Sequence, residues 1–526
     1  MKISIKGFQG PLARTACTEL ARRGHQIVDS RADCLLFFPG AIEELVRLVE
    51  TGDFRRIVLR SHAYAYGAST KNPGMMTEKR ISLLPDDAAA QGWLRAEAIV
   101  AKSPSWAAVR LATVLEPDEG DLLAQKIEGR TAVAPAGHDP NVQFLSLADA
   151  ASALAAAVES NAGGIFNAAG DGSIPMKKVL RAAATRRIPV FKQLMPLFDN
   201  SPDMEQLQYN WTVSSERAAR ELGFRPSMST VEALADFLRS RPGADLSLLQ
   251  APYDEWGLDL DYVRAWGSWF NFLKNVYWRV EFEGMDNIPA AGRALYVANH
   301  RGFMPIDGVI HLWLILNNRG RVVRFLIIPS LLRISFLCNF LTKLGGVVAS
   351  QENAARLFEQ EALVGMFPEG IRGAFTPYKT AYQLRDFSKS GFARMAIVNQ
   401  APVIPVAVVG HAEIFPIIGR INSGYVTRKL GWPYLPIAPM FPLAPVPIPS
   451  KWHVRVLEQV PLQGLKPADA DNRTLVEDFS RHVQNIVQKN IDQMVTRRKH
   501  IFWGRVLDGT APVVPRFDGR NRAMTA

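Results

Sequence analysis

The sequence predicts an α/β protein with two domains, on two observations. Short apolar segments alternate with helical patterns from residue 1 to about 240, and 526 residues are too many for one ordinary core. The first apolar segment, Ile3-Ser4-Ile5, leads into a glycine-containing turn and an alanine- and arginine-rich helix. Later strand candidates are 34–38, 56–60 and 107–111. Since strands that alternate with helices form parallel βαβ units, we expect a parallel sheet in this half.

Composition and charge limit the class of protein. A hydrophobic fraction of 48% with 21% charged residues is typical of a globular chain. The net charge of +11 favours anionic partners, namely a membrane surface, nucleic acid, or phosphorylated and coenzyme-A-type substrates. Three widely spaced cysteines make neither a disulfide framework nor a metal site, and they suit a reducing compartment. The opening segment, Met1 to Gly7, reads as a strand and not as a signal segment.

Hydropathy gives no candidate for a membrane-spanning helix. No uninterrupted apolar run reaches the ~18–20 residues that such a helix needs. The closest candidate, 322–348, is interrupted by a proline and by three basic residues: Arg324, Pro329, Arg333 and Lys343. We expect this stretch to be interfacial or buried.

The residues best suited to catalysis lie in the second half. His300 follows the apolar run 294–298, and Asp307 comes seven residues after it. A histidine side chain can act as a general base near neutral pH, and a carboxylate beside it fixes the tautomer and stabilises the imidazolium. Further on, the segment 367–372 (Phe-Pro-Glu-Gly-Ile-Arg) offers a carboxylate, a loop glycine and a guanidinium that can hold a polar acceptor. Together the two segments point to acyl transfer.

Four ordered blocks extend this pattern through residues 284–490. They are 299–307, 344–354, 366–373 and 402–410, the last preceded by 389–393. In this order they resemble the glycerolipid acyltransferase family, which includes the lysophosphatidate acyltransferases. The resemblance implies a C-terminal α/β acyltransferase domain. Such a domain moves a fatty acyl group from acyl-coenzyme A or acyl carrier protein to the hydroxyl of a lysophospholipid or other lipid alcohol, with no metal or other cofactor.

The resemblance also implies roles for single residues. His300 is the general base and Asp307 orients it, while Glu369 and Gly370 shape the acceptor site and Arg372 meets an anion. The full substrate-binding set expected is Gly302, Phe367, Pro368, Glu369, Gly370, Arg372 and Gln351.

Two features depart from the family pattern. Six residues separate His300 from Asp307 where the family commonly has four, and we expect Gly302 and Pro305 to let the carboxylate fold back beside the ring. Gln351 stands where the family often has a phosphate-gripping arginine, so we expect a weaker dependence on an acceptor phosphate. One alternative stays open for the pair: a satisfied core histidine and a helix-capping aspartate.

The N-terminal half resembles the extended short-chain dehydrogenase, or nucleotide-sugar epimerase, family. The stretches that carry the likeness are Gly7-x-x-Gly10-x-x-Ala13, 61–67, 144–150 and 164–167. The resemblance implies a Rossmann-like fold with an NAD(P) site at Gly7, Gly10 and Ala13.

This half also departs from its family. The catalytic Tyr-x-x-x-Lys falls on Gln91 to Arg95, which has no phenol to carry a proton. The segment from Asp29 to Asp33 jumps almost directly into the next strand, so half of the cofactor cleft is expected to be trimmed. We interpret the domain as a scaffold or regulatory module.

The expected domains are a Rossmann-like one at 1–240, a linker with an amphipathic aromatic helix at 241–283, the acyltransferase domain at 284–495 and a basic tail at 496–526. The aromatic helix, with Trp266 and Trp269 among basic residues, either lies in a membrane interface or packs on the catalytic domain. Basic residues around the third and fourth blocks are candidates to attract the acyl donor: Lys379, Arg385, Lys389 and Arg394. The proline- and aromatic-rich segment 431–452 can line an acyl chain or form a hydrophobic lid.

We therefore expect a cytoplasmic acyltransferase, peripheral at the inner face of the cell membrane, with no nucleic-acid partner. Two rival functions remain: an NAD(P)-dependent epimerase or reductase with a fused lipid-binding module, and a non-catalytic membrane scaffold.

Overall fold

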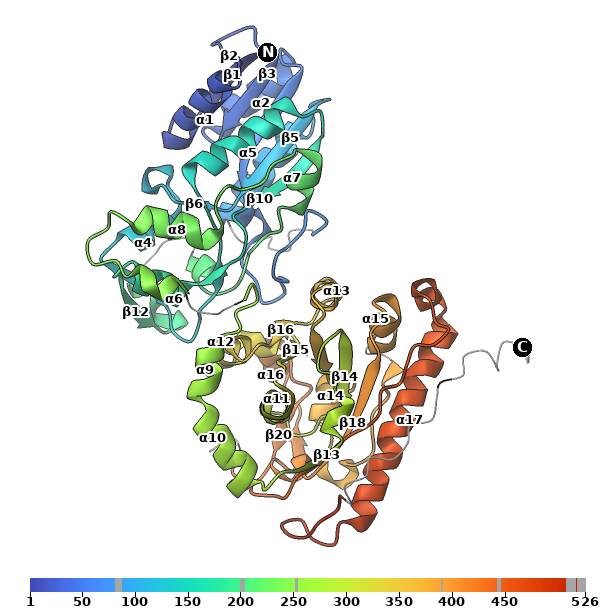
Figure 1. Ribbon diagram of the computed structural model, residues 1–526. Coiled ribbons are helices and arrows are strands. Elements are labelled where there is room, and N and C mark those ends of the chain that lie inside the picture. Colours follow the sequence, from blue (N-terminus) through green and yellow to red (C-terminus); the bar gives the residue numbers. More distant parts are fainter. Residues whose placement is uncertain are drawn as a thin grey trace. The chain divides into compact units, whose positions relative to one another are not determined.

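The computed structural model describes residues 1–80, 88–198, 204–250, 254–388, 391–441, 446–507 and 517. Lys389 and most of the expected basic tail lie outside these residues. The chain divides into two compact units (Figure 1). Unit 1 holds Met1–Asp259 with Ser335–Thr342, and unit 2 holds Leu260–Ile334 with Lys343–Ala526. The expected limit at residue 240 thus falls inside unit 1.

Unit 1 is built on a parallel sheet with helices on both faces, as the strand and helix alternation predicts (Figure 1). Its strands, in the spatial order β10-β5-β4-β3-β1-β2, are all parallel to their neighbours. Successive residues of β3 and β4 point to opposite faces, so one core forms against α1 and α5 and another against α2 and α3. The elements are β1 Lys2–Gly7, α1 Pro11–Arg22, β2 Gln26–Ile27, β3 Cys34–Phe38, α2 Ile42–Thr51, β4 Arg56–His62, α3 Ala88–Val100, β5 Trp106–Leu111, α5 Leu147–Glu159 and β10 Gly164–Ala168.

The strand order is Rossmann-like with one strand missing. A doubly wound sheet has the order 3-2-1-4-5-6. Here β2 is the outermost strand of the described sheet, and residues 28–33, all of them described, lead directly to β3 on the other side of β1. The predicted trimming between Asp29 and Asp33 is therefore confirmed.

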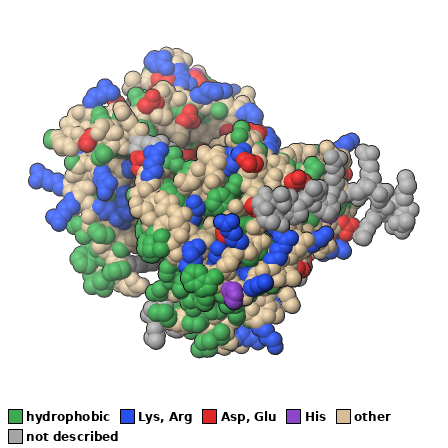
Figure 2. Space-filling model, turned by 60° about the horizontal axis from the view of Figure 1, so that its bottom comes forward, with side chains coloured by type: hydrophobic (Ala, Val, Ile, Leu, Met, Phe, Trp, Pro, Cys, Tyr) green, Lys and Arg blue, Asp and Glu red, His purple; other side chains and the backbone are tan. Residues whose placement is uncertain are grey.

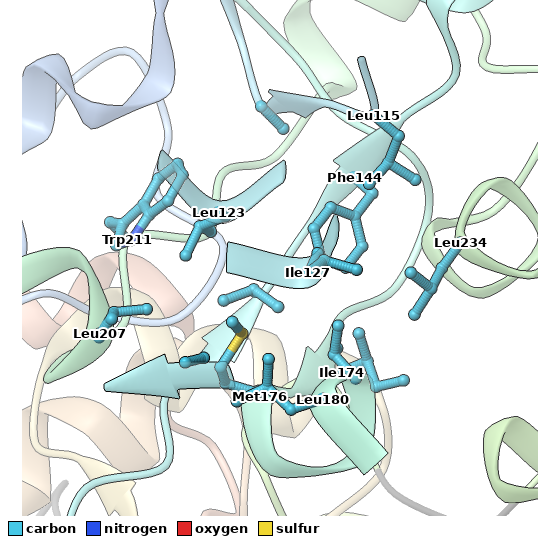
Figure 3. Close-up of a cluster of buried hydrophobic side chains, with 14 of the residues drawn as sticks. Leu115, Leu123, Ile127, Phe144, Ile174, Met176, Leu180, Leu207, Trp211 and Leu234 are labelled. Atoms are coloured by element: carbon cyan, nitrogen blue, oxygen red, sulfur yellow. The ribbon is translucent and has the colours of Figure 1, made fainter. Parts of the chain in front are cut away.

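A second hydrophobic core in unit 1 joins short strands and helices that follow the main sheet (Figure 3). Leu123, Ile127, Phe144 and Leu180 point toward one another within it. The elements around it are β6 Thr113–Val114, α4 Leu122–Glu128, β7 Thr131–Pro135, β8 Asn141–Val142, β9 Phe144–Leu145, β11 Ile174–Pro175, α6 Met176–Ala182, β12 Arg186–Val190, α7 Glu216–Glu221 and α8 Thr230–Leu238.

Unit 2 contains a seven-stranded sheet of order β13-β21-β18-β14-β17-β15-β16. β21 is antiparallel to β18, and the other neighbouring pairs are parallel. Its strands are β13 Glu281–Glu283, β14 Ala294–Ala298, β15 Val323–Ile327, β16 Val347–Val348, β17 Leu363–Met366, β18 Val403–Val409 and β21 His453–Val456. Its main helices are α11 Ile306–Arg319, α13 Gln351–Glu359, α14 Gly370–Ala374, α15 Phe392–Val398, α16 Gly424–Leu430 and α17 Arg473–Arg497. The α/β class expected for both halves is confirmed.

The expected aromatic helix is made of α9 Leu260–Ala265, α10 Gly267–Phe272 and a π-helical turn, Leu273–Tyr277. One face packs on unit 2: Phe270 is buried with its ring centre 5.6 Å from that of Trp313. The other face leaves Trp269 and Val276 more than half exposed. The helix therefore packs on unit 2 with one face and exposes apolar side chains on the other. In the described part of the chain, no helix has the length and apolarity to cross a membrane.

Candidate active site

Three neighbouring parallel strands of unit 2 end at one edge of the sheet. β14 lies between β17 and β18, and its register with both is parallel. His300 follows β14, Glu369 follows β17, and His411 follows β18. Because the carboxyl ends of parallel strands meet at one edge, residues more than a hundred positions apart in sequence come together there.

His300 and Asp307 form a direct hydrogen-bonded pair. His300 Nδ1 is 2.5 Å from Asp307 Oδ2. Asp307 lies in the first turn of α11, where its other oxygen accepts the Gly308 N–H at 2.9 Å. Gly302, at φ +74°, turns the intervening segment 301–306 (the strap) back on itself. Glycine adopts this conformation without strain. The six-residue spacing thus still brings the carboxylate to the ring.

The other imidazole nitrogen of His300 is available for chemistry. With Nδ1 bound to the carboxylate, Nε2 has no hydrogen-bond partner among the described residues. Phe367 stacks on the imidazole with ring centres 4.6 Å apart, and Phe325 stacks on Phe367 at 5.2 Å. The side chain of His300 is 13% exposed. Asp307 therefore orients the imidazole, Phe367 covers one face of the ring, and the ring stays partly exposed to solvent.

Beneath His300 lies a buried ion pair between Arg301 and Glu369. Arg301 Nη1 is 2.5 Å from Glu369 Oε1, and neither side chain is more than 1% exposed. The Arg301 guanidinium also donates to the carbonyl oxygens of His300, Ala381 and Gln383. Glu369 accepts the backbone N–H of His300 at 3.2 Å and that of Arg385 at 2.7 Å. Both oxygens of Glu369 are thus occupied by the protein itself.

The other expected binding residues are divided between core and surface. Pro368 is buried and Phe367 half-buried beside His300. Gly370, at φ +53°, begins α14, and Arg372 on that helix is exposed with no ion pair among the described residues. Gln351, the first residue of α13, is also exposed. The structure therefore brings Gly302, Phe367, Pro368 and Glu369 around His300 and leaves Arg372 and Gln351 on the surface.

An aromatic cluster lies along the same strap. Phe303, next to Gly302, packs against four rings from later segments, with ring centres between 4.6 and 6.1 Å from its own: Phe375, Phe415, Trp432 and Phe441. Two of these rings come from the proline- and aromatic-rich segment expected to line an acyl chain or form a lid. The segment does supply an apolar wall beside the His300 strap.

Several buried polar residues at this edge were not predicted from the sequence. The Tyr296 hydroxyl and His311 Nδ1 lie 2.5 Å apart, and both side chains are fully buried. Asn299 ties β14 to β18 by bonding both the N–H and the C=O of Val408. His311 follows Asp307 by four residues, so helical spacing would have placed the two on one face. No comparable signal marks Arg301 as buried.

Burial makes the stability of this edge sensitive to acid. It lowers the pKa of His311 to about 4, against 6.5 for an unperturbed histidine, and it lowers the pKa of His411 in the same direction. Below about pH 6.5, His311 is protonated in the unfolded chain but stays neutral in the folded protein. The free energy of unfolding therefore falls as the pH drops toward 4. Between pH 7.5 and 5 we expect His311 alone to contribute about 2 kcal/mol of this loss. Urea unfolding at pH 7.5 and 5 measures it. His311→Gln should flatten the dependence, and an unchanged slope in that variant would refute the assignment.

The residues expected to hold a dinucleotide in unit 1 do not fit one. Gly7 and Gly10 do form a tight turn before α1, and Ala13 is buried in the helix. However, the N-terminus of α1 is occupied by the Glu119 carboxylate, which accepts the Leu12 N–H at 2.7 Å. Gln91 and Arg95, expected in place of the catalytic Tyr-x-x-x-Lys, are both exposed on α3.

Comparison with known proteins agrees with the geometry of unit 2. A family model described as Acyltransferase matches residues 279–409, which include His300, Asp307 and Glu369. An uncharacterized protein of Mycobacterium leprae is 31% identical over 302 residues, which are 56% of this chain and 79% of that protein. Residues 279–409 therefore form a domain of the acyltransferase family. The predicted resemblance of the C-terminal half is thereby confirmed.

Two further similarities complete the comparison. A bovine protein described as a DGAT1/2-independent enzyme synthesizing storage lipids is 26% identical over 222 residues, or 41% of this chain and 60% of that protein. Among solved structures, UDP-N-acetylglucosamine 4-epimerase from Bacillus cereus is 16% identical with a TM-score of 0.37, covering 46% of this chain and 100% of that one. The Rossmann-like assignment of unit 1 rests on its own strand order.

Proposed function

We propose that the protein transfers a fatty acyl group from a thioester donor, acyl-coenzyme A or acyl carrier protein, to the hydroxyl of a lipid. The observation that carries the proposal is the contact between His300 and Asp307 at the carboxyl end of β14. It supplies a general base with its orienting carboxylate inside a domain of the acyltransferase family.

The reaction needs no nucleophile from the protein. The lipid hydroxyl oxygen attacks the thioester carbonyl carbon while His300 Nε2 takes the hydroxyl proton, and Asp307 stabilises the resulting imidazolium. The tetrahedral intermediate then collapses, the C–S bond breaks, and the imidazolium returns its proton to the departing thiolate. One ester and one thiol are formed, and His300 is restored.

The acceptor we propose is a neutral lipid alcohol, a mono- or diacylglycerol. Gln351 supplies no charge at the position where relatives often have an arginine, and Arg372 is the exposed guanidinium on α14. The similarity to a storage-lipid enzyme supports the same acceptor class. Tight binding of an acceptor phosphate would require bidentate, charge-assisted hydrogen bonds, which the neutral amide of Gln351 does not supply.

We expect turnover on monoacylglycerol or diacylglycerol to equal or exceed that on lysophosphatidate. Purified protein with one radiolabelled acyl-coenzyme A and each acceptor in mixed micelles gives the comparison. Arg372→Ala should leave turnover on the neutral acceptor nearly unchanged, and Gln351→Arg should favour lysophosphatidate. A strict requirement for the acceptor phosphate in the wild type would contradict this choice.

The partner surface we propose is a membrane. Large apolar side chains are exposed on α10, on the π turn and on the segment after α17: Trp269, Phe272, Val276, Ile501, Phe502 and Trp503, here the aromatic patch. Arg279 joins its two parts, donating to the Phe502 carbonyl at 3.0 Å with its guanidinium 5.0 Å from the centre of the Trp503 ring. Lys499 and Arg505 are exposed beside it. Figure 2 shows hydrophobic side chains gathered on one face with basic ones among them.

Aromatic and basic side chains together suit an anionic lipid interface. We expect the protein to sediment with vesicles containing phosphatidylglycerol, less with pure phosphatidylcholine, and less at high salt. The double variant Trp269→Ala/Trp503→Ala should lose about tenfold in vesicle affinity, and Ile421→Ala, exposed outside the aromatic patch, should not. Equal loss in both variants would count against the aromatic patch.

Exposed cations near α14 are the proposed attractors of the acyl donor. Lys379 and Arg385 are exposed with no ion pair among the described residues, whereas Arg394 is paired with Asp471 at 3.1 Å. Arg385 and Arg420 both lie near Tyr434, since each acts electrostatically on its pKa. These charges would favour either an acidic carrier protein or the phosphates of coenzyme A.

A further inference from the structure

The carboxyl edge of the unit 1 sheet is where a Rossmann-like fold takes a dinucleotide, with the pyrophosphate at the N-terminus of the first helix. In this chain that helix is α1. It has neither an acidic side chain in its first turn nor a side-chain cap from its own N-cap residue. Asp29 lies just after β2, about 20 residues beyond Gly10, where an acid for a ribose hydroxyl is expected. The sequence fingerprint therefore looks nearly complete.

The chain's own carboxylate occupies the phosphate position. Glu119, at the end of the turn Pro117–Glu119, accepts the Leu12 N–H through Oε1 at 2.7 Å. The same oxygen is 2.5 Å from the point where a Cβ on Gly10 would stand. The Phe8 ring lies 2.3 Å from the same point, so this oxygen and the ring together fill the space that the glycine leaves open. The positive end of α1 stabilises the charge of the carboxylate.

Charged and aromatic side chains fill the neighbouring part of the edge. Arg60 on β4 is 6% exposed, its guanidinium lies 4.9 Å from the centre of the Trp93 ring, and no hydrogen bond to it occurs among the described residues. The carboxylates of Asp121 and Glu119 both lie near enough to act on it electrostatically. Asp121 in turn is 2.8 Å from His62 Nε2. The charge of Glu119 is therefore balanced internally, and a pyrophosphate placed here would meet two carboxylates.

The adenine side of the cleft is reduced as well. β2 has two residues, both exposed, and residues 28–33 pass directly to β3 without another strand or helix. A strand and helix at that place form one wall of the adenine pocket in a complete doubly wound sheet. The usual pyrophosphate position is thus occupied, and one wall of the usual adenine pocket is missing.

We propose that unit 1 is a closed Rossmann-like module in which Glu119 takes the place of the dinucleotide pyrophosphate. The module binds no nicotinamide dinucleotide, and Glu119 instead holds the start of α1 to the turn Pro117–Glu119. This inference is independent of the acyl transfer proposed for unit 2.

Calorimetric titration of the full-length protein with NAD⁺, NADH, NADP⁺ and NADPH is the first test. We expect no saturable binding with a Kd below ~1 mM for any of the four. Any such binding by the wild type would overturn the proposal.

Removal of the carboxylate is the second test. Glu119→Ala should lower the thermal midpoint of unit 1 by about 2–4 °C and speed hydrogen exchange of the Leu12 amide. Asp118→Ala, an exposed carboxylate on the same turn, should do neither. Inorganic pyrophosphate should raise the midpoint of Glu119→Ala more than that of the wild type, because an anion can then reach the vacated helix end. Equal midpoints, Leu12 exchange rates and pyrophosphate responses in Glu119→Ala and Asp118→Ala would overturn the assignment of Glu119.

Discussion

Replacement of His300 by alanine is expected to lower kcat for acyl transfer by about 10²–10⁴-fold, the range for loss of a positioned general base. The fold should persist, because the imidazole is partly exposed and its one hydrogen bond within the described part of the chain is to Asp307. Asp307→Asn should lose nearly as much, since an amide keeps the volume but not the charge that stabilises the imidazolium. Initial rates of ester formation from radiolabelled acyl-coenzyme A measure both.

The control is His482→Ala, the same change on α17 away from the site. It should retain wild-type kcat, and circular dichroism with thermal melts should show that all three variants are folded. If His300→Ala kept a tenth or more of wild-type kcat, His300 would not be the base, and the open alternative of a satisfied core histidine would stand.

Removal of the Glu369 carboxylate is expected to have the largest effect on stability. Glu369→Ala leaves the Arg301 guanidinium buried without its partner and frees the backbone N–H groups of His300 and Arg385. Breaking a buried ion pair in this way costs about 3–5 kcal/mol. Because Glu369 holds the backbone of His300, the proposed general base, kcat should fall with stability. Urea unfolding and steady-state kinetics on the same preparations measure the two losses.

The conservative variant Glu369→Gln distinguishes a structural role of Glu369 from a role in binding the acceptor. Glu369→Gln should lower kcat and the free energy of unfolding together, with little change in KM for the acceptor. Glu359→Ala, an exposed carboxylate on α13, should change none of these. If Glu369 instead binds the acceptor, Glu369→Gln should raise KM for the acceptor and leave the unfolding free energy unchanged.

The sequence was sufficient for the parts of the site that depend on local order. An apolar strand followed by His300, and Phe367–Glu369 after another strand, place both segments at one sheet edge, because parallel strands share their carboxyl ends. The turn at Gly302 also allowed the unusual spacing to Asp307 to be anticipated. The fold of the N-terminal half follows from strand and helix alternation, whereas the fold of the C-terminal half was implied by the family resemblance of its four blocks.

Long-range contacts account for what the sequence did not reveal. The burial of Arg301 depends on the carbonyls of Ala381 and Gln383, about 80 residues away, and nothing around Arg301 signals them. Glu119 reaches the start of α1 from 107 positions along the chain. A glycine fingerprint records the backbone turn, and it does not record which side chain fills the space above that turn.

A separate observation argues against each of the two rival functions. An epimerase or reductase would need a proton-carrying phenol, and the expected positions Gln91 and Arg95 are exposed on α3. A non-catalytic scaffold would have no reason to keep a buried carboxylate 2.5 Å from an otherwise accessible imidazole. Burial of these polar groups costs hydration free energy, and a role in catalysis would account for their presence.

The most direct test is product analysis with purified wild-type protein, one acyl-coenzyme A and diacylglycerol, beside a reaction that lacks the acceptor. We predict that thiol and ester appear in equal amounts, only when the acceptor is present, and that intact-mass spectrometry finds no acylated protein. Thiol release without acceptor, or an acyl group attached to the chain, would contradict direct attack by a lipid hydroxyl deprotonated by His300.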